Sequence, residues 1–204
     1  MHLRDSLLSL SSDGFEGLIF DLDGTLVDSM PAHYKAWCEA LDDQGAPGVF
    51  PEDVFYAMGG RPTRDIVEAL NRAHGLSLDQ CAVSKSKKGF FLKNLDQIEL
   101  IGEVADIAQE YRDKVPLAIA TGGGRVVVDK TLQKLGISSW FDAVVTASDV
   151  AHGKPSPDIF LEAARQIKVM PDRCVVFEDA EPGVVGARAA GMEVILIPDR
   201  LRIH

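Results

Sequence analysis

Two patterns of apolar positions alternate along the second half of this chain. Short apolar runs with little polar alternation, typical of strands covered on both faces, occupy residues 17–23, 115–120, 143–146, 174–178 and 193–197. Between the later runs, segments 125–136, 157–168 and 182–190 have helical patterns. Glycine, a common stop for a helix, stands at positions 136 and 191. Alternating strands and helices predict a parallel sheet with helices on both faces.

The stretch from about residue 29 to residue 98 predicts helices and no convincing strand. Ser29 and Pro31 can open a helix that runs to about residue 45, a second helix follows Pro62, and a third covers about 78–93. We therefore predict an α/β fold with a doubly wound parallel sheet. Its core comprises residues 1–28 and 99–204, and residues 29–98 form an inserted helical domain.

Composition and charge narrow the classes of function. The formal net charge of −10 argues against a nucleic acid as partner, because proteins that bind phosphate backbones usually present a basic face. No apolar run approaches the length that spans a membrane, so we expect no membrane partner. Cys38, Cys81 and Cys174 form no CxxC pair, so we expect buried thiols in a reducing compartment, the cytoplasm.

The first apolar run ends in two carboxylates, Asp21 and Asp23, followed by Gly24. Ligands of open parallel sheets bind outside the carboxyl ends of the strands, and alternation along a strand predicts that both acids point to the same side. Neighbouring carboxylates repel each other unless they share a proton or hold a cation, and oxygen ligands suit Mg²⁺. An acidic turn that caps the next element is the plainer alternative, but DxDGT directly after a buried strand favours a magnesium site.

A second acidic pair, Glu178 and Asp179, follows the apolar run 174–178. Acids at this place could merely favour the positive end of the following helix. Together with Asp21, however, they supply the third carboxylate that a magnesium site needs. We therefore predict that these three side chains meet.

Two further segments indicate an anion site. Thr121 and Gly122 open a turn of three glycines, whose N–H groups and hydroxyl could cradle an anion, although a flexible turn is the alternative. Lys154 stands between Gly153 and Pro155, although most lysines are solvated surface charges. A cation, this lysine and the turn would form a local positive pocket in an acidic protein. A small phosphorylated metabolite is the expected substrate.

These elements, in this order, resemble the haloacid dehalogenase superfamily of phosphotransferases over roughly residues 17–198. The sequences HYKAW (33–37) and FEDAEPGVVGARAAGM (177–192) resemble its β-phosphoglucomutase subgroup. GGRPT (59–63) adds a similarity to fructose-1-phosphate phosphatase-like members. The resemblance implies a Rossmann-like core with a helical cap domain over residues 29–98, and Mg²⁺ as cofactor.

The resemblance also implies roles. Asp21 is the nucleophile and a metal ligand, and Asp23 is the acid/base that binds metal through its backbone carbonyl. Asp179 completes the metal shell, with Glu178 beside it or bound through water. Thr121, with Gly122, and Lys154 hold the transferring phosphate. A carboxylate near its reference pKa of about 4 is ionised at neutral pH, so we expect Asp21 to need no activating base.

The choice between hydrolase and mutase depends on the cap. His33 and Trp37 share a helix face, and His33 is a candidate substrate contact. Thr63 aligns with the arginine by which mutases of the subgroup grip a second phosphate, although Arg61 and Arg64 could replace it.

Thr25, where these mutases have valine, also favours a phosphatase. Lys87 is a further cap cation, although a solvated lysine is its simpler interpretation. We predict a phosphatase acting on a sugar phosphate similar to fructose 1-phosphate, as a monomer or weak dimer. A β-phosphoglucomutase is the alternative; a non-catalytic binding protein is disfavoured because every catalytic side chain is present.

Overall fold

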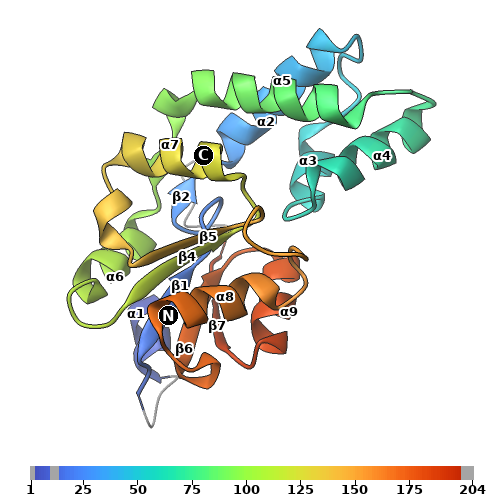
Figure 1. The fold of residues 1–204 in the computed structure, drawn as a ribbon. Helices are drawn as coiled ribbons and strands as arrows, with labels where there is room; N and C mark the ends of the chain where they lie inside the picture. Colours follow the sequence, from blue (N-terminus) through green and yellow to red (C-terminus); the bar gives the residue numbers. More distant parts are fainter. Residues whose placement is uncertain (1–2, 10–13, 199–204) are drawn as a thin grey trace. The chain divides into compact units, whose positions relative to one another are not determined.

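The structure is a computed structural model, which describes residues 3–9 and 14–198. By its internal contacts the chain divides into two compact units (Figure 1). The sheet unit contains the described residues of 1–28 and 99–204, and the helical unit is Ser29–Ile98.

The described part of the sheet unit is built on a five-stranded parallel sheet of order β5-β4-β1-β6-β7. Its strands are β1 (Gly17–Phe20), β4 (Leu117–Thr121), β5 (Ala143–Thr146), β6 (Cys174–Glu178) and β7 (Glu193–Leu196). Phe20 pairs with Ile119 of β4 and Phe177 of β6, so the carboxyl ends of these three strands lie side by side. A separate antiparallel pair, β2 (Val27–Asp28) and β3 (Glu99–Leu100), joins the chain where it leaves the sheet unit and where it returns.

Helices cover both faces of the sheet (Figure 1). They are α6 (Gly102–Tyr111), α7 (Arg125–Leu135), α8 (Asp158–Ile167) and α9 (Glu181–Ala189), with the short 3₁₀ helices η2 (Ser138–Trp140) and η3 (Pro171–Arg173). Because crossovers between parallel strands are right-handed, α6 and α7 lie on one face and α8 and α9 on the other. Residues Ile19, Val145, Phe160 and Val176 belong to the core between the sheet and α8, each fully buried.

The helical unit contains α2 (Met30–Asp43), α3 (Glu52–Ala57), α4 (Thr63–His74), α5 (Gln80–Lys93) and the 3₁₀ helix η1 (Leu95–Gln97). Within this unit, α2 packs mainly against α5. The unit has a small core of its own, which includes Trp37, Phe50, Phe55 and Val67. Ser29 occupies the N-cap position of α2, but its side chain does not make the capping bond that we expected.

Three helices were not in our prediction: α1 (Leu3–Ser9), α3 and α6. In α1, Leu3 and Leu7 are four residues apart and both are buried, with α6 and β7 as neighbours of the helix. Segments as short as α1 and α3 carry too few turns for their periodicity to be convincing in the sequence, whereas α6 is as long as α8, which was predicted. The strand β1 also ends earlier than predicted, at Phe20.

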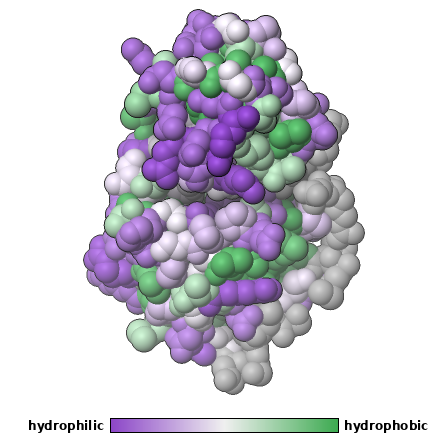
Figure 2. Space-filling view, turned by 90° about the vertical axis from the view of Figure 1, so that its right-hand side faces the viewer, coloured by the Kyte–Doolittle hydropathy of each residue, from purple (hydrophilic) through white to green (hydrophobic). Residues whose placement is uncertain are grey.

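Most of the face drawn in Figure 2 is hydrophilic, and apolar side chains form small separate patches. The cysteine prediction is partly wrong: Cys174 is buried, with burial raising the pKa of its thiol to about 12, whereas Cys38 is half-buried and Cys81 is exposed. Of the helices in 3–9 and 14–198, none combines the length and apolar character that crossing a bilayer demands.

Shortening a buried side chain of the central strand β1 should destabilise the fold strongly. Ile19→Ala removes a fully buried side chain, so we expect the free energy of unfolding to fall by about 2–5 kcal/mol. Val185→Ala removes a side chain that is 48% exposed and should change it by no more than about 0.5 kcal/mol. Denaturant unfolding of both variants measures the difference; equal effects would contradict the assigned core.

Candidate active site

Three carboxylates meet at the carboxyl ends of β1 and β6. Asp21, Glu178 and Asp179 each offer an oxygen, and these atoms lie within 4.8 Å of one another. Asp21 follows the last residue of β1 and Glu178 ends β6, which pairs directly with β1. The sheet therefore brings together acids that are more than 150 residues apart in sequence.

Lys154 lies between two of these acids. Its Nζ donates to Asp21 Oδ1 and to Glu178 Oε2, both at 2.6 Å, and only 7% of its side chain is exposed. The ammonium group also lies 5.1 Å from the centre of the buried Phe160 ring of α8. The lysine is thus a positioned cation, unlike the solvated surface charge that was the alternative.

The expectation of an ordinary pKa for Asp21 is wrong. Burial, followed by the neighbouring charge of Glu178, raises the pKa of Asp21 well above its usual value, although Lys154 acts to lower it. For Lys154 the balance is reversed. Burial acts to lower its pKa, but the charges of Asp21 and Glu178 outweigh burial and raise it. The lysine is therefore protonated at neutral pH.

Two glycines make room for the acidic side chains. Gly24 has a φ of +89°, and a methyl group built on it would lie 2.6 Å from Asp179 Oδ2. A methyl group on Gly183, in the first turns of α9, would lie only 2.1 Å from Glu178 Oε2. No side chain larger than hydrogen fits at either place without moving a carboxylate of the cluster.

Thr25 holds Asp179 in position. The buried hydroxyl of Thr25 donates to Asp179 Oδ1 at 2.8 Å. Sequence reasoning used Thr25 only to separate phosphatases from mutases and missed this contact. A buried hydroxyl next to a carboxylate cluster fixes the orientation of one oxygen and leaves the other for a ligand.

Asp23 is close to the glycine turn that follows β4. Its carboxylate is not a member of the three-residue cluster, and a methyl group built on Gly123 would lie 3.7 Å from Asp23 Oδ2. The argument from strand alternation does not apply to it, because β1 ends at Phe20 and the chain turns at Gly24. The carboxylate of Asp23 therefore faces the glycine turn after β4.

That turn begins at Thr121, the buried last residue of β4. Its Oγ1 accepts a hydrogen bond of 3.0 Å from Gly123 N, and Gly122 is exposed. A methyl group on Gly123 would lie 2.9 Å from Val128 Cγ2, so this turn needs glycine. The small side chains leave the backbone open to a ligand.

The predicted cap residues lie in the helical unit. His33, in α2, stacks on Phe91 of α5 with ring centroids 4.0 Å apart. One turn further along the same two helices, the Lys87 ammonium lies 5.1 Å from the centre of the Trp37 ring. Thr63 is the half-buried first residue of α4.

The carboxylate cluster fits a divalent cation. Three carboxylates and one ammonium leave two formal negative charges in a largely buried place. Oxygen donors on three side chains are the set that Mg²⁺ prefers, and they leave positions for water or a phosphate oxygen. A bound cation would offset the mutual repulsion that contributes to the raised pKa of Asp21.

The fold and the acidic cluster define an α/β enzyme whose active site lies at the ends of parallel strands. The family of haloacid dehalogenase-like hydrolases matches residues 15–191. The chain belongs to this family.

Individual relatives agree with the subgroup. The chain is 37% identical to the fructose-1-phosphate phosphatase YqaB of Escherichia coli K12, over 89% of this chain and 95% of that protein. It is 28% identical to the β-phosphoglucomutase of Bacillus subtilis 168, over 87% and 80% of the two chains. The crystal structure of CbbY from Rhodobacter sphaeroides in complex with phosphate superposes with a TM-score of 0.80 at 26% identity, covering 90% of this chain and 86% of that one.

These findings confirm the family, the α/β fold class and the enzyme class, a phosphoric monoester hydrolase of the haloacid dehalogenase type. The structure brings together Asp21, Glu178, Asp179 and Lys154. Besides the contact of Thr25, sequence reasoning missed the role of Gly183. A signal for Gly183 was present, since a glycine inside a helix costs about 1 kcal/mol relative to alanine and suggests a close approach.

Removing the Thr25 hydroxyl should weaken cation binding. Thr25→Val keeps the shape but deprives Asp179 Oδ1 of its donor, so we expect the affinity for Mg²⁺ to fall about 10–100-fold in calorimetric titration. Thr131→Val is the matched control, because within the described residues the buried Thr131 hydroxyl has no hydrogen-bond partner. Equal affinities in the two variants would contradict the proposed support of Asp179.

Proposed function

We propose that the protein is a magnesium-dependent phosphatase that hydrolyses a small phosphorylated sugar, similar to fructose 1-phosphate, through an aspartyl-phosphate intermediate. The observation that carries this proposal is the meeting of Asp21, Glu178 and Asp179 with the buried Lys154 ammonium. The 37% identity to a fructose-1-phosphate phosphatase supports the substrate class.

In the first step, a carboxylate oxygen of Asp21 attacks the phosphorus atom, and the bond between phosphorus and the sugar oxygen breaks. Asp23 donates a proton to the leaving sugar oxygen, which departs as an alcohol. The position of the Asp23 carboxylate next to the glycine turn supports this role, because it lies outside the carboxylate cluster that would hold the cation.

In the second step, Asp23 takes a proton from a water molecule that attacks the aspartyl phosphate. The bond between phosphorus and the Asp21 oxygen breaks, and inorganic phosphate leaves. Asp23 recovers its proton and Asp21 its charge, so the enzyme returns to its starting state.

Asp21, Glu178 and Asp179 would hold Mg²⁺ through their side chains, with the Asp23 backbone carbonyl as a further ligand. The cation supplies neutralisation of the charge on the transferring phosphoryl group. Lys154 and Thr121 bind the equatorial phosphate oxygens, and the N–H group of Gly122 adds a donor. The ammonium of Lys154 suits this task because it is already buried and protonated beside the nucleophile.

We propose that the helical unit acts as the cap and selects the sugar. His33 and Thr63 are the proposed substrate contacts. Lys87 is added to them, because its ammonium is held over the Trp37 ring, on the same pair of helices as the His33–Phe91 stack. Thr63 offers no charge for a second phosphate. The absence of this charge favours a monophosphate substrate and water as the final acceptor. Of the flanking cations, Arg64 is exposed and pairs with Asp65.

A β-phosphoglucomutase is the second candidate, and the 28% identity to such an enzyme favours it. A panel of sugar phosphates, assayed with Mg²⁺ and with or without a bisphosphate activator, separates the two. We expect release of phosphate from fructose 1-phosphate and no glucose 6-phosphate from β-glucose 1-phosphate. Efficient isomerisation that depends on the bisphosphate would instead establish the mutase.

Asp21→Asn should nearly abolish turnover in this panel, by a factor on the order of 10⁴ as is usual when a nucleophile is lost. The melting temperature should not fall, because the variant keeps the shape and relieves the repulsion between Asp21 and Glu178. Asp172→Asn, at an exposed position, is the matched control and should keep its activity. Retained activity of Asp21→Asn would exclude Asp21 as the nucleophile.

A further inference from the structure

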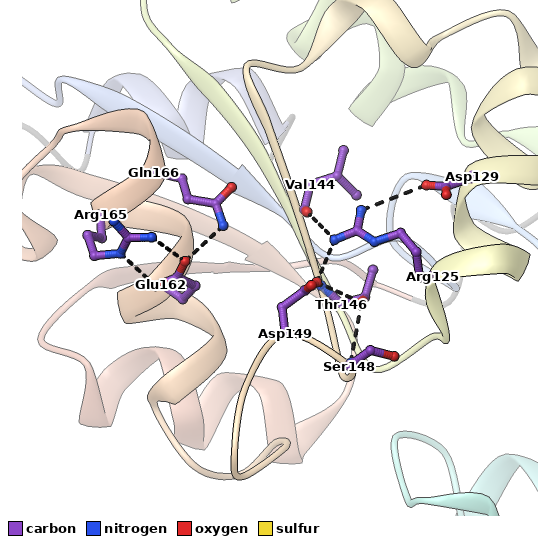
Figure 3. A network of polar contacts seen from close by, with 9 residues as sticks. All are labelled: Arg125, Asp129, Val144, Thr146, Ser148, Asp149, Glu162, Arg165 and Gln166. Carbon is purple, nitrogen blue, oxygen red and sulfur yellow. Dashed lines mark hydrogen bonds and ion pairs between the residues drawn. The ribbon is translucent and has the colours of Figure 1, made fainter.

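An arginine at the start of α7 connects this helix to the end of strand β5 (Figure 3). The Nη2 atom of Arg125 donates to Val144 O at 2.9 Å and also to Asp149 Oδ2. Its Nη1 atom lies 3.7 Å from Asp129 Oδ1. The residue immediately follows the glycine turn 121–124 that the proposed function assigns to phosphate binding.

Asp149 closes the loop that follows β5. Its Oδ2 accepts hydrogen bonds from the N–H and from the hydroxyl of Thr146, both at 2.7 Å. Thr146 is the fully buried last residue of this strand. Burial acts to raise the pKa of Asp149, but the bonds from Thr146 and the charge of Arg125 outweigh it and lower the pKa. Asp149 is therefore ionised at neutral pH and can hold both partners.

The ends of β4 and β5 are paired in register, and the segments that follow them are linked by a hydrogen bond. Thr121 and Thr146 are register partners, and each hydroxyl accepts from the N–H two residues further on, at 3.0 Å from Gly123 and 3.3 Å from Ser148. Ala147 N also donates to Gly123 O at 3.3 Å. The turn after β4 and the loop after β5 are thus held against each other, and the second of them leads to Lys154.

The position of Arg125 is unfavourable for a helix by itself, because a cation in the first turn opposes the helix dipole. Its side chain is 38% exposed, and ion pairs at such places add little to stability. Its contacts with Val144 O and Asp149 nevertheless fix where α7 and the glycine turn begin relative to β5. This combination indicates an effect on geometry rather than on the stability of the fold.

We propose that Arg125 and Asp149 form a clamp that positions two phosphate-binding segments, the turn 121–124 and the loop leading to Lys154. Neither residue touches the substrate; both are positioning residues. The proposal rests on the proposed function, because it assumes that these segments bind the transferring phosphate. It goes beyond that function by assigning a role to two residues that lie outside the carboxylate cluster.

The test compares Arg125→Gln and Asp149→Asn with Arg165→Gln. Arg165 makes a comparable ion pair with Glu162 on α8 at 2.6 Å, drawn in the same view, but it contacts neither segment (Figure 3). For each variant, kcat and KM on the best substrate of the panel, the inhibition constant of inorganic phosphate and the melting temperature are measured. Arg125→Lys, which keeps the charge but not the planar fork of donors, is included for partial rescue.

We expect Arg125→Gln and Asp149→Asn to lower kcat/KM about 10–100-fold, since small misplacements of binding groups have effects of this size. Phosphate should inhibit both variants about tenfold more weakly, because the binding segments themselves have shifted. The kcat/KM of the double variant should be no lower than that of the less active single variant, because the effects of partners in one network do not add. Arg165→Gln should match the wild type, and the melting temperatures should stay close together.

If Arg125→Gln had the same inhibition constant for phosphate and the same kcat/KM as the wild type, the proposed clamp would be wrong. A loss of activity that only follows a loss of folded protein, with unchanged phosphate inhibition of the remainder, would also overturn it. Both outcomes leave the proposed function intact, since the wild type is active. A wild type without magnesium-dependent phosphate release would contradict the proposed function, and the clamp with it.

Discussion

The active site depends on one balance of charge: a buried ammonium held between carboxylates that would otherwise repel each other. Lys154 donates at 2.6 Å to both Asp21 and Glu178, and all three side chains are almost completely buried. Burial penalises every one of these charges, and the Lys154 ammonium offsets part of the repulsion between the two carboxylates. The excess of negative charge that remains is the reason why this place suits a divalent cation and, with it, a phosphate.

The architecture of the sheet supplies the remaining conditions. β1 lies between β4 and β6, so the ends of three strands bring Asp21, the glycine turn and the acidic pair to one edge of the sheet. Close approach then depends on small residues, because Gly24 and Gly183 leave no room for a methyl group beside Asp179 and Glu178. A net charge of −10 repels a phosphate substrate, and hydrogen-bond donors and cations at the site offset this repulsion locally.

Several predictions from the sequence failed for identifiable reasons. The alternation argument for Asp23 assumed a strand up to residue 23, whereas β1 ends at Phe20 and the chain turns. The ordinary pKa expected for Asp21 ignored burial, which a linear sequence does not measure. Helices α1 and α3 are short, and the packing of Leu3 and Leu7 of α1 in the interior is visible only in the fold.

The sequence by itself determined the strand and helix alternation, the helical insertion and the identity of the acids at the strand ends, because these follow from local periodicity and short motifs. It also indicated Lys154 and the turn at Thr121. Only the tertiary structure decided that Lys154 bridges Asp21 and Glu178, that Thr25 supports Asp179, and that Arg125 reaches Asp149. These contacts join residues 24 to 154 positions apart, and their distances depend on how strands pair and how closely helices approach, which no local pattern encodes.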